Sequence, residues 1–559
     1  MLVLISLAVP LLLAIALSNH RGRHAIPLLL PVAALPVLAL ALLQSVSTLE
    51  LPWLLQGTQL GVDELNRPLL LLAALIWTAV GCYARGWLLE QESRKVRFQL
   101  FYLLTLSGNV GVLLAQDVVG FYFFYALMAF ATYGLIVHDG SPMARRAGRI
   151  YMALAVGGEA LLLCALWFIA DASSGFNIKL ADLAAHIAEM PQRDLVVGLV
   201  LASFAVKMGS VPLHIWLPAS YRCAPTPASA ALGGIVIKAG LLGWLRFLPL
   251  GQVALPEVGE ICIAVGMLSA FYGALVGVLQ ERPKTVVAYS SISQMGLLTA
   301  LLGVALTAPA IWPSLVNLMV LFSLHHGIAK AALFLGVDVA GRNMPGSGWL
   351  LTLPALALAG APLTSGAVAK LGFKEAGSLA PGDWSHWMPL LLTLSSGATT
   401  LLMARLLYLA WPRQSGRLPS PWLLTPWLGL LVALWLVPWW WSITQLPGLL
   451  PRALEASALL DSAGVLIGCS VVAVIVWGIG RITRLRYVLP EGDVVILGQW
   501  LSLWKRNMGL SAAKLPKLTM VIGVHNWNVL NGERYLLHWP VAGLGFLALF
   551  VVLVFLLVR

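Results

Sequence analysis

Long apolar segments separated by short polar segments follow one another along the whole chain. About sixteen of the apolar segments approach the roughly 20 residues that a helix needs to cross the hydrocarbon core of a bilayer. The pattern therefore predicts an all-α polytopic membrane protein with about sixteen transmembrane helices. We place the spans at residues 2–18, 25–46, 68–86, 98–115, 117–137, 149–171, 194–218, 227–248, 258–280, 286–306, 312–340, 349–376, 387–410, 422–442, 463–481 and 539–558.

Basic residues alternate along the loops between these segments. If the N-terminus lies outside, every second loop carries most of the Lys and Arg residues, and such loops stay in the cytoplasm. The alternation predicts a multi-pass protein of the bacterial inner membrane, and it accounts for the net charge of +12 without nucleic acid as a partner. The first apolar segment has no basic residue ahead of it, unlike a secretory signal peptide, so we expect a retained helix. The basic loop residues are Arg21 and Arg23; Arg85, Arg94, Lys95 and Arg97; Arg145, Arg146 and Arg149; Arg282 and Lys284; Arg342; Arg413 and Arg417; and Arg481, Arg484 and Arg486.

Four lysines lie inside predicted spans: Lys207, Lys238, Lys330 and Lys370. A charge at the bilayer centre costs roughly 2.5–3.5 kcal/mol, so four charges facing lipid would cost on the order of 10–14 kcal/mol. We therefore expect these side chains to face a polar path inside the protein. Burial disfavours the charged form of an amine, which lets a buried lysine exchange protons near neutral pH. The four lysines predict a proton relay.

Two of the predicted spans contain residues that interrupt a helix. Gly209, Pro212 and Pro218 follow Lys207, and a similar group precedes Lys370: Pro354, Gly360, Pro362 and Gly366. Interrupted helices in transporters expose backbone groups and helix ends around an ion path. One interrupted helix in each half of the chain also indicates a two-fold internal repeat.

Cofactor motifs are missing from the sequence. The five cysteines form no CxxC pair, and neither a P-loop nor a dinucleotide-binding glycine motif is present. We expect no cofactor, no metal site and no redox centre in this chain. Energy for any ion movement would then come from another subunit.

Four sequence segments carry a family resemblance: FAVKMGSVPLHIWLP at 204–218, QERPKTVVAYSSISQM at 280–295, HHGIAKAALFL at 325–335 and APLTSGAVAK at 361–370. Together they resemble the antiporter-like membrane subunits shared by respiratory complex I, Mrp-type cation/proton antiporters and membrane-bound hydrogenases. The likeness covers residues 60–415 approximately. It implies a fourteen-helix core with two inverted five-helix repeats and with broken seventh and twelfth helices.

This resemblance divides the chain into six regions. The repeats would occupy residues 98–248 and 258–410, preceded by N-terminal helices at 1–97. C-terminal helices would occupy 411–481, followed by a cytoplasmic segment at 482–538 and a last helix at 539–559. The spans beyond the fourteenth and the cytoplasmic segment exceed the family core, and we expect them to serve docking. The mixed aromatic and basic content of 482–538 is typical of an amphipathic interfacial helix, or of an ordinary solvated loop.

The resemblance also implies roles for individual residues. Lys207 matches the lysine of the broken seventh helix, Lys238 the central lysine of the eighth, and Lys370 the exit residue of the twelfth. His326 and Lys330 match a pair on the eleventh helix, where a spacing of four places them on one face. Possible accessory residues, which could hold bridging waters, are His214, His325, Tyr289 and Ser291.

One position departs from the family pattern. Members of the family carry a glutamate on the fifth helix that pairs with the seventh-helix lysine, but this chain has Ala126 there. Glu159, midway along the next predicted span and beside two glycines, is our candidate replacement as the partner of Lys207. The alternatives are that Glu159 pairs with Lys238 or with a neighbouring subunit, or that the half-channel containing Lys207 does not conduct protons.

These observations predict a proton-translocating subunit of a larger membrane complex, without a redox reaction of its own. The complex would be of the complex I or hydrogenase type, or an Mrp-type antiporter that moves Na+ or K+ against H+. One alternative is a proton-conducting subunit that powers inorganic-carbon uptake by a separate zinc protein. The other is a non-conducting scaffold, for which Ala126 is the main argument.

Overall fold

The computed structural model describes residues 1–43, 46–55, 57–91, 94–173, 175, 178–412, 414, 416 and 418–483. Nearly all of the predicted interfacial segment and the whole predicted span at 539–558 lie outside the described residues, as do Arg413, Arg417, Arg484 and Arg486. Helices make up almost all of the regular structure in the described part. The predicted all-α membrane fold is confirmed.

The N-terminal region combines helices with one hairpin. The predicted span at 25–46 corresponds to two helices joined by a 3-10 turn, which together form one apolar stretch from His20 to Leu43. The hairpin was not predicted, although its strands alternate polar and apolar side chains with the period of two that a strand requires. The elements are α1 (Leu2–Ala16), α2 (His20–Leu29), η1 (Leu30–Val32), α3 (Leu35–Leu43), the antiparallel pair β1 (Ser47–Leu51) and β2 (Thr58–Val62), and α4 (Asn66–Leu89).

The next part of the chain contains the first interrupted helix. It comprises α5 (Lys95–Leu114), α6 (Val118–Ile136), α7 (Pro142–Ala172), α8 (Leu180–Glu189), α9 (Arg193–Met208), α10 (Trp216–Cys223), α11 (Thr226–Ala231), the π-helical turn η2 (Leu232–Val236) and α12 (Lys238–Phe247). The predicted span at 227–248 is thus one apolar stretch with a wider turn directly before Lys238. Such turns are often found at functional sites.

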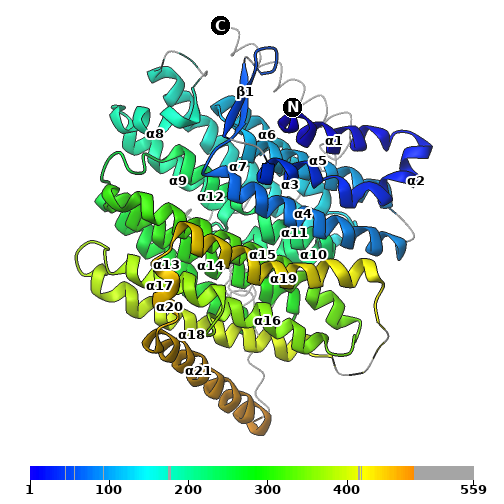
Figure 1. The fold of residues 1–559 in the computed structure, drawn as a ribbon, viewed down its shortest axis with the longest axis vertical. Coiled ribbons are helices and arrows are strands. Elements are labelled where there is room, and N and C mark those ends of the chain that lie inside the picture. Colours follow the sequence, from blue (N-terminus) through cyan, green and yellow to red (C-terminus); the bar gives the residue numbers. More distant parts are fainter. Residues whose placement is uncertain are drawn as a thin grey trace, which may run out of the picture. The chain divides into compact units, whose positions relative to one another are not determined.

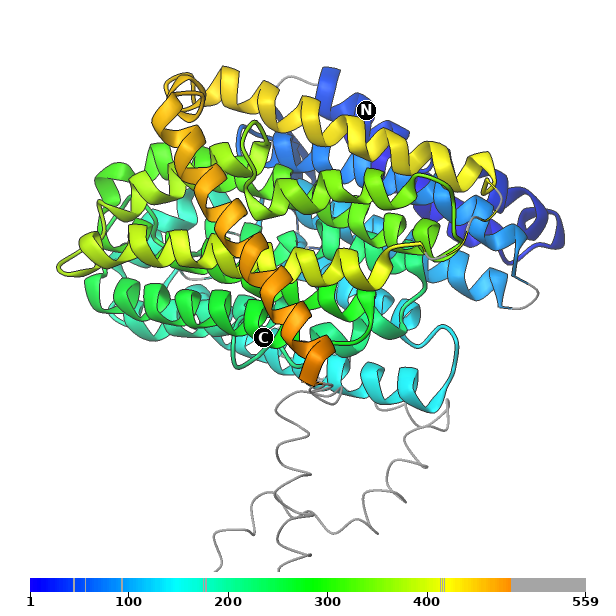
Figure 2. The ribbon, with the colours of Figure 1, turned by 90° about the horizontal axis from the view of Figure 1, so that it is seen from below.

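The remaining helices contain the second interruption. They are α13 (Pro256–Val278), α14 (Pro283–Thr307), η3 (Pro309–Ile311), α15 (Trp312–Gly341), α16 (Ser347–Ala359), α17 (Ser365–Gly377), α18 (Trp384–Ala410), α19 (Pro421–Gln445), α20 (Leu449–Ala453) and α21 (Ala456–Thr483). Helices α4, α15 and α19 lie side by side, so the N-terminal helices contact both later parts of the chain (Figure 1). Figure 2 shows α21 crossing α18 obliquely, and Lys374 of α17 pairs with Asp461 of α21 at 2.5 Å.

Both predicted helix interruptions are confirmed. Helix α9 ends where Gly209 adopts φ +68°, and α16 ends where Gly360 adopts φ +83°, a conformation that costs other residues energy. Helix α17 restarts with Thr364 as its N-cap, whose side chain accepts a hydrogen bond from the Ala367 N–H. Pro354 lies within α16 and does not end it, so glycine rather than proline terminates this half-helix.

Within the described residues, twelve helical stretches are long and apolar enough to cross a membrane by length and composition. Shorter and interrupted helices, including α1, α9 and α16, fall outside that count. The predictions of about sixteen spans and of two inverted repeats therefore remain predictions.

The loops predicted to face the cytoplasm contact one another at one end of the helices. Arg342, after α15, pairs with Glu90, after α4, at 2.7 Å. The Gly416 N–H donates to the Asn343 carbonyl at 2.7 Å, which joins a third loop of the same set to the loop after α15. The side of the membrane on which these loops lie remains a prediction.

Candidate functional site

Lys207 lines a small cavity at the end of α9. The cavity of about 10 Å³ is close to the minimum that holds one water, and its lining includes Glu159 from α7 and Tyr125 from α6. The Lys207 ammonium lies 5.5 Å from the Tyr125 ring centroid and 5.9 Å from that of Tyr151. Among the described residues, no hydrogen-bond partner reaches Lys207 Nζ. An amine, a carboxylate and room for one water therefore share one buried site.

Lys238 and His326 form a direct contact between α12 and α15. The distance from Lys238 Nζ to His326 Nδ1 is 2.6 Å, and both side chains are fully buried. Helix α12 also packs closely on α9, because a Cβ on Gly240 would stand 3.1 Å from Lys207 Cβ. The π-helical turn directly precedes Lys238, whose side chain contacts the histidine of α15.

Lys330 follows His326 by one helical turn and contacts α14. Its Nζ donates to the Val287 carbonyl at 2.7 Å and to the Ser290 hydroxyl. Ser290 was not predicted. The predicted accessory residue Ser291 instead donates to the Val287 carbonyl of its own helix at 3.5 Å. Tyr289, the other predicted accessory residue of this helix, is buried. The sequence predicted the correct segment of α14. Packing determines how that helix is rotated, and therefore that Ser290 faces Lys330.

Lys370 and His325 lie at the second helix interruption. Lys370 Nζ donates to the carbonyl of Ala359, the last residue of α16, at 2.8 Å. His325 Nδ1 lies 2.9 Å from Ser365 Oγ in the first turn of α17, and its Nε2 is buried with no hydrogen-bond partner among the described residues. His325 therefore links the central helix α15 to the half-helix that carries Lys370, a role that sequence assigned only as accessory.

The predicted relay residues are all buried and lie on five helices, with Glu159 on α7. Lys207 is on α9, Lys238 on α12, His326 with Lys330 on α15, and Lys370 on α17. His214, the remaining accessory residue, is buried after the first interruption, with its ring 4.9 Å from that of Tyr272 in an edge-on arrangement. Among the described residues, no group of three or more His, Cys, Asp and Glu side chains is placed to hold a metal ion.

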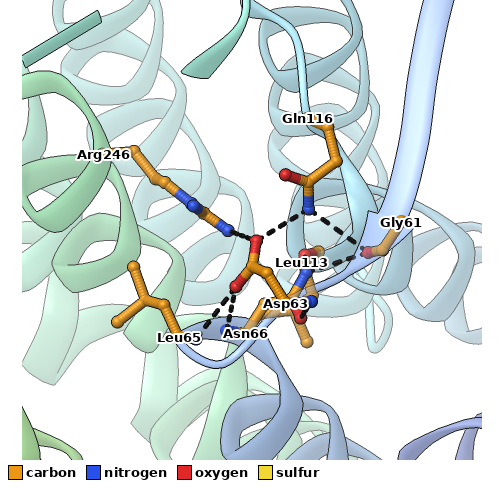
Figure 3. Close-up of polar contacts among 7 residues, drawn as sticks. All are labelled: Gly61, Asp63, Leu65, Asn66, Leu113, Gln116 and Arg246. Atoms are coloured by element: carbon orange, nitrogen blue, oxygen red, sulfur yellow. Dashed lines mark hydrogen bonds and ion pairs between the residues drawn. The ribbon is translucent and has the colours of Figure 1, made fainter. Parts of the chain in front are cut away.

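A polar cluster at the opposite end of α4 from Glu90 fixes the C-terminal end of α12 (Figure 3). Arg246 pairs with Asp63, and Asp63 Oδ1 also accepts the N–H groups of Leu65 and Asn66 at 2.9 and 2.8 Å. Gln116 Nε2 donates to Asp63 Oδ2 at 2.8 Å. Burial raises the pKa of the Asp63 carboxyl, but the Arg246 charge and these hydrogen bonds outweigh it and hold the pKa below its ordinary value. We call these residues the outer clamp.

Comparison with known proteins matches the sequence of this chain to one family. Residues 115–399, about half of the chain, match the model of the NADH:quinone oxidoreductase/Mrp antiporter transmembrane family. The chain is 31% identical over 329 residues to NAD(P)H-quinone oxidoreductase chain 4 1 of Synechococcus sp. (strain JA-3-3Ab), which covers 56% of this chain and 60% of that protein. It is 28% identical over 358 residues to an Na(+)/H(+) antiporter subunit of Bacillus subtilis (strain 168), covering 60% and 70% respectively.

A solved structure supports the same fold. The Mrp complex from Dietzia sp. DQ12-45-1b contains a chain that matches 98% of this chain and 63% of its own length, with a TM-score of 0.71 and 20% sequence identity. At that identity the likeness concerns the fold. The chain spans about 60% of the length of the cyanobacterial relative. From its matched residues and its fold, the chain belongs to the NADH:quinone oxidoreductase/Mrp antiporter transmembrane family.

Proposed function

We propose that this chain is a proton-translocating subunit of a multisubunit membrane complex. The observation that carries the proposal is the contact of Lys238 with His326, with Lys330 one turn further along the same helix. Two basic groups at 2.6 Å inside a protein repel each other strongly when both are charged, so the pair holds one proton at a time. A site of this kind passes a proton on when a neighbouring charge changes.

The order of transfer follows the contacts. A proton on Lys207, beside the cavity that holds one water, moves to Lys238 on the neighbouring helix α12. From Lys238 it passes to His326, and then to Lys330 on the same helix as His326. His325 and Ser365 connect this central group to Lys370. Each arrival raises the electrostatic cost of charging the next site, which couples the two ends of the series.

Glu159 is the proposed counter-charge for Lys207. It lines the same cavity, whereas Ala126, at the family position of the glutamate, carries no charge. The carboxylate has moved by one helix, from α6 to α7, while remaining beside the lysine. This arrangement favours a conducting first half over a scaffold role.

The partners would be other membrane and peripheral subunits, in a complex of the complex I or hydrogenase type or in an Mrp-type antiporter with Na+ or K+ as a second ion. The relatives named above are themselves a quinone oxidoreductase chain and an antiporter subunit. The proposal places the chain in the bacterial inner membrane with its N-terminus outside, and its two repeats at residues 98–248 and 258–410.

Lys238→Met in the purified native complex tests the proposal. Reconstituted into vesicles with an internal pH dye, the variant should lose proton translocation while the complex keeps its subunit composition, because the substitution keeps the side-chain length and removes the titrating group. Lys374→Met, on the exposed pair with Asp461, is the matched control and should translocate normally. If the Lys238→Met complex translocates protons at the wild-type rate, the proton-translocating role is wrong and the non-conducting scaffold is favoured.

The subunits that co-purify identify the complex. Flavin and iron–sulfur subunits indicate the redox-driven type, and small antiporter subunits indicate the Mrp type. One large soluble zinc protein instead indicates the inorganic-carbon alternative.

A further inference from the structure

A second, larger cavity opens at the end of the helices where Glu90 and Arg342 lie. It has a volume of about 300 Å³, many times what one water needs, and it lies between the starts of α11 and α14 and the end of α15. We call it the vestibule. Its lining includes Thr226, Lys284, Phe334, Val337, Asp338 and Arg342.

Asp338 is a carboxylate at an electrostatically unfavourable place in its helix. It sits in the last turn of α15, where the partial negative charge of the helix end disfavours a carboxylate. Two groups nevertheless hold it there. Arg342 Nε donates to Asp338 Oδ2 at 3.0 Å, and the hydroxyl of Tyr83, a fully buried residue of α4, donates to the same oxygen. Arg342 is also shared with Glu90, at 2.7 Å.

The vestibule lies on the same seam between α14 and α15 as Lys330. Along α15, Asp338 follows Lys330 by eight residues, or about 12 Å of helix rise, on the same face. Phe334 lies midway between them, is fully buried and forms part of the vestibule lining. Along α14, Lys284 lines the vestibule, and the next turn supplies the Val287 carbonyl that binds Lys330. Phe334 is thus the vestibule-lining residue that lies between Asp338 and Lys330 along α15.

We propose that the vestibule is the aqueous inlet that delivers protons to Lys330, with Asp338 as the group that collects them. The carboxylate takes a proton from a hydronium ion in the vestibule and becomes neutral beside Arg342. Rotation of Phe334 admits water, and the proton passes from the Asp338 carboxyl group to the unprotonated amine of Lys330. The carboxylate formed by this step pairs with Arg342 again.

The charges of the vestibule favour protons over metal cations. Lys284 and Arg342 place two cationic groups beside the single carboxylate of Asp338, and Lys284 Nζ is held there by the Ala224 carbonyl at 2.7 Å. A sodium or potassium ion would need several oxygen ligands and would be repelled by both cations. This inference rests on the proposed relay function and adds to it the place where protons enter.

Three variants in the reconstituted complex test the inlet. Asp338→Asn should lower proton translocation at least fivefold, and Asp338→Glu should keep at least half of the wild-type rate. Glu90→Gln is the matched control, because it removes the other carboxylate bound to Arg342 but leaves Asp338 in place, and it should translocate normally. A Glu90→Gln loss equal to that of Asp338→Asn would show a purely structural ion-pair network and would overturn the inference.

Cysteine labelling tests the same inlet without measuring transport. In a background with the five native cysteines replaced by alanine, Val337→Cys should react with a membrane-impermeant thiol reagent from the cytoplasmic side only. Val339→Cys, on the same helix but fully buried, should stay unlabelled. An unreactive Val337→Cys would overturn the inference.

The variant Lys330→Met distinguishes failure of the proposed inlet from failure of the proposed relay. If Lys330→Met stops translocation while Asp338→Asn leaves it at the wild-type rate, the inlet is wrong and the relay stands. If Lys330→Met also translocates at the wild-type rate, the relay function itself is wrong, and the inlet with it.

Discussion

At the scale of single residues, the site depends on amines that have few fixed counter-charges. Lys238 faces a histidine, Lys330 faces a hydroxyl and a carbonyl, and Lys370 faces a carbonyl. None of these partners is a carboxylate, so a proton on one lysine is not held in place by a permanent negative charge. Lys207 differs, because Glu159 shares its cavity.

The counter-charge of Lys207 gives a residue-scale prediction. Glu159→Gln should lower proton translocation at least about tenfold, because it removes the carboxylate that favours the charged form of Lys207. Ala126→Glu added to Glu159→Gln should restore part of the rate, since Ala126 neighbours Tyr125 and lies one turn from Ala129, both of which line the cavity. Vesicle acidification driven by the native complex measures all three proteins.

The double substitution also contains its own control. Ala126→Glu alone should translocate no faster than wild type, because the cavity then holds two carboxylates for one lysine. Wild-type translocation by Glu159→Gln would contradict the replacement of the fifth-helix glutamate.

At the scale of the helices, the second interruption places a backbone carbonyl and a new helix start beside Lys370 and His325. The Ala359 carbonyl is free to accept from Lys370 because α16 ends at Gly360. The same interruption gives α17 a new N-terminus, whose first residue is the Ser365 that meets His325. A continuous helix would use these groups for its own hydrogen bonds.

The second interruption gives an element-scale prediction. Gly360→Ala should lower the free energy of unfolding by about 1–2 kcal/mol for the left-handed backbone alone. It should also slow proton translocation, because the new Cβ would stand 2.8 Å from Lys370 Cδ and displace that side chain. Thermal denaturation and vesicle acidification measure the two effects separately.

Gly346 provides the matched control for this change. It has a similar φ of +75° but no atom within 4 Å of an added Cβ. Gly346→Ala should therefore lose the same stability and keep the wild-type rate. Equal rates for Gly360→Ala and Gly346→Ala would mean that the position of Lys370 does not depend on the interruption.

At the scale of the whole molecule, polar contacts at both ends join helices that are far apart in sequence. Asp63 precedes α4 and Arg246 ends α12, so the outer clamp ties the N-terminal helices to the helix that carries Lys238. At the other end, Tyr83 of α4 and Arg342 converge on Asp338. Helix α4 thus spans from one cluster to the other.

The outer clamp gives a prediction for stability against pH. The pKa of folded Asp63 lies below its ordinary value of 3.8, so its contribution is complete above that value and is lost as the pH falls through the folded pKa. The melting temperature of Asp63→Asn should therefore lie below that of wild type by a constant amount from about pH 8 to pH 5, and the gap should shrink below about pH 4.

The measurement is a series of melting curves of the purified protein across this pH range. Glu64→Gln changes the same charge at the next, exposed position and should melt like wild type throughout. A gap for Asp63→Asn that closes between pH 7 and pH 5 would contradict the assigned pKa direction.

The sequence by itself determined the membrane class, the two helix interruptions and the residue types of the relay. Each of these follows from local physical chemistry: apolar length sets a span, glycine at a left-handed position ends a helix, and a lysine within an apolar span must find a polar interior. The prediction of the relay residues Lys207, Lys238, His326, Lys330 and Lys370 also drew on matched family positions.

Only the tertiary structure decided which groups meet. The contacts of Lys330 with Ser290, of His325 with Ser365 and of Tyr83 with Asp338 depend on how helices rotate and pack against one another, and residues up to 255 positions apart are brought together. Asp338 was not among the predicted site residues, and its proposed role comes only from the vestibule around it. Periodicity along a chain fixes which face of a helix is apolar, but not which neighbouring helix that face contacts.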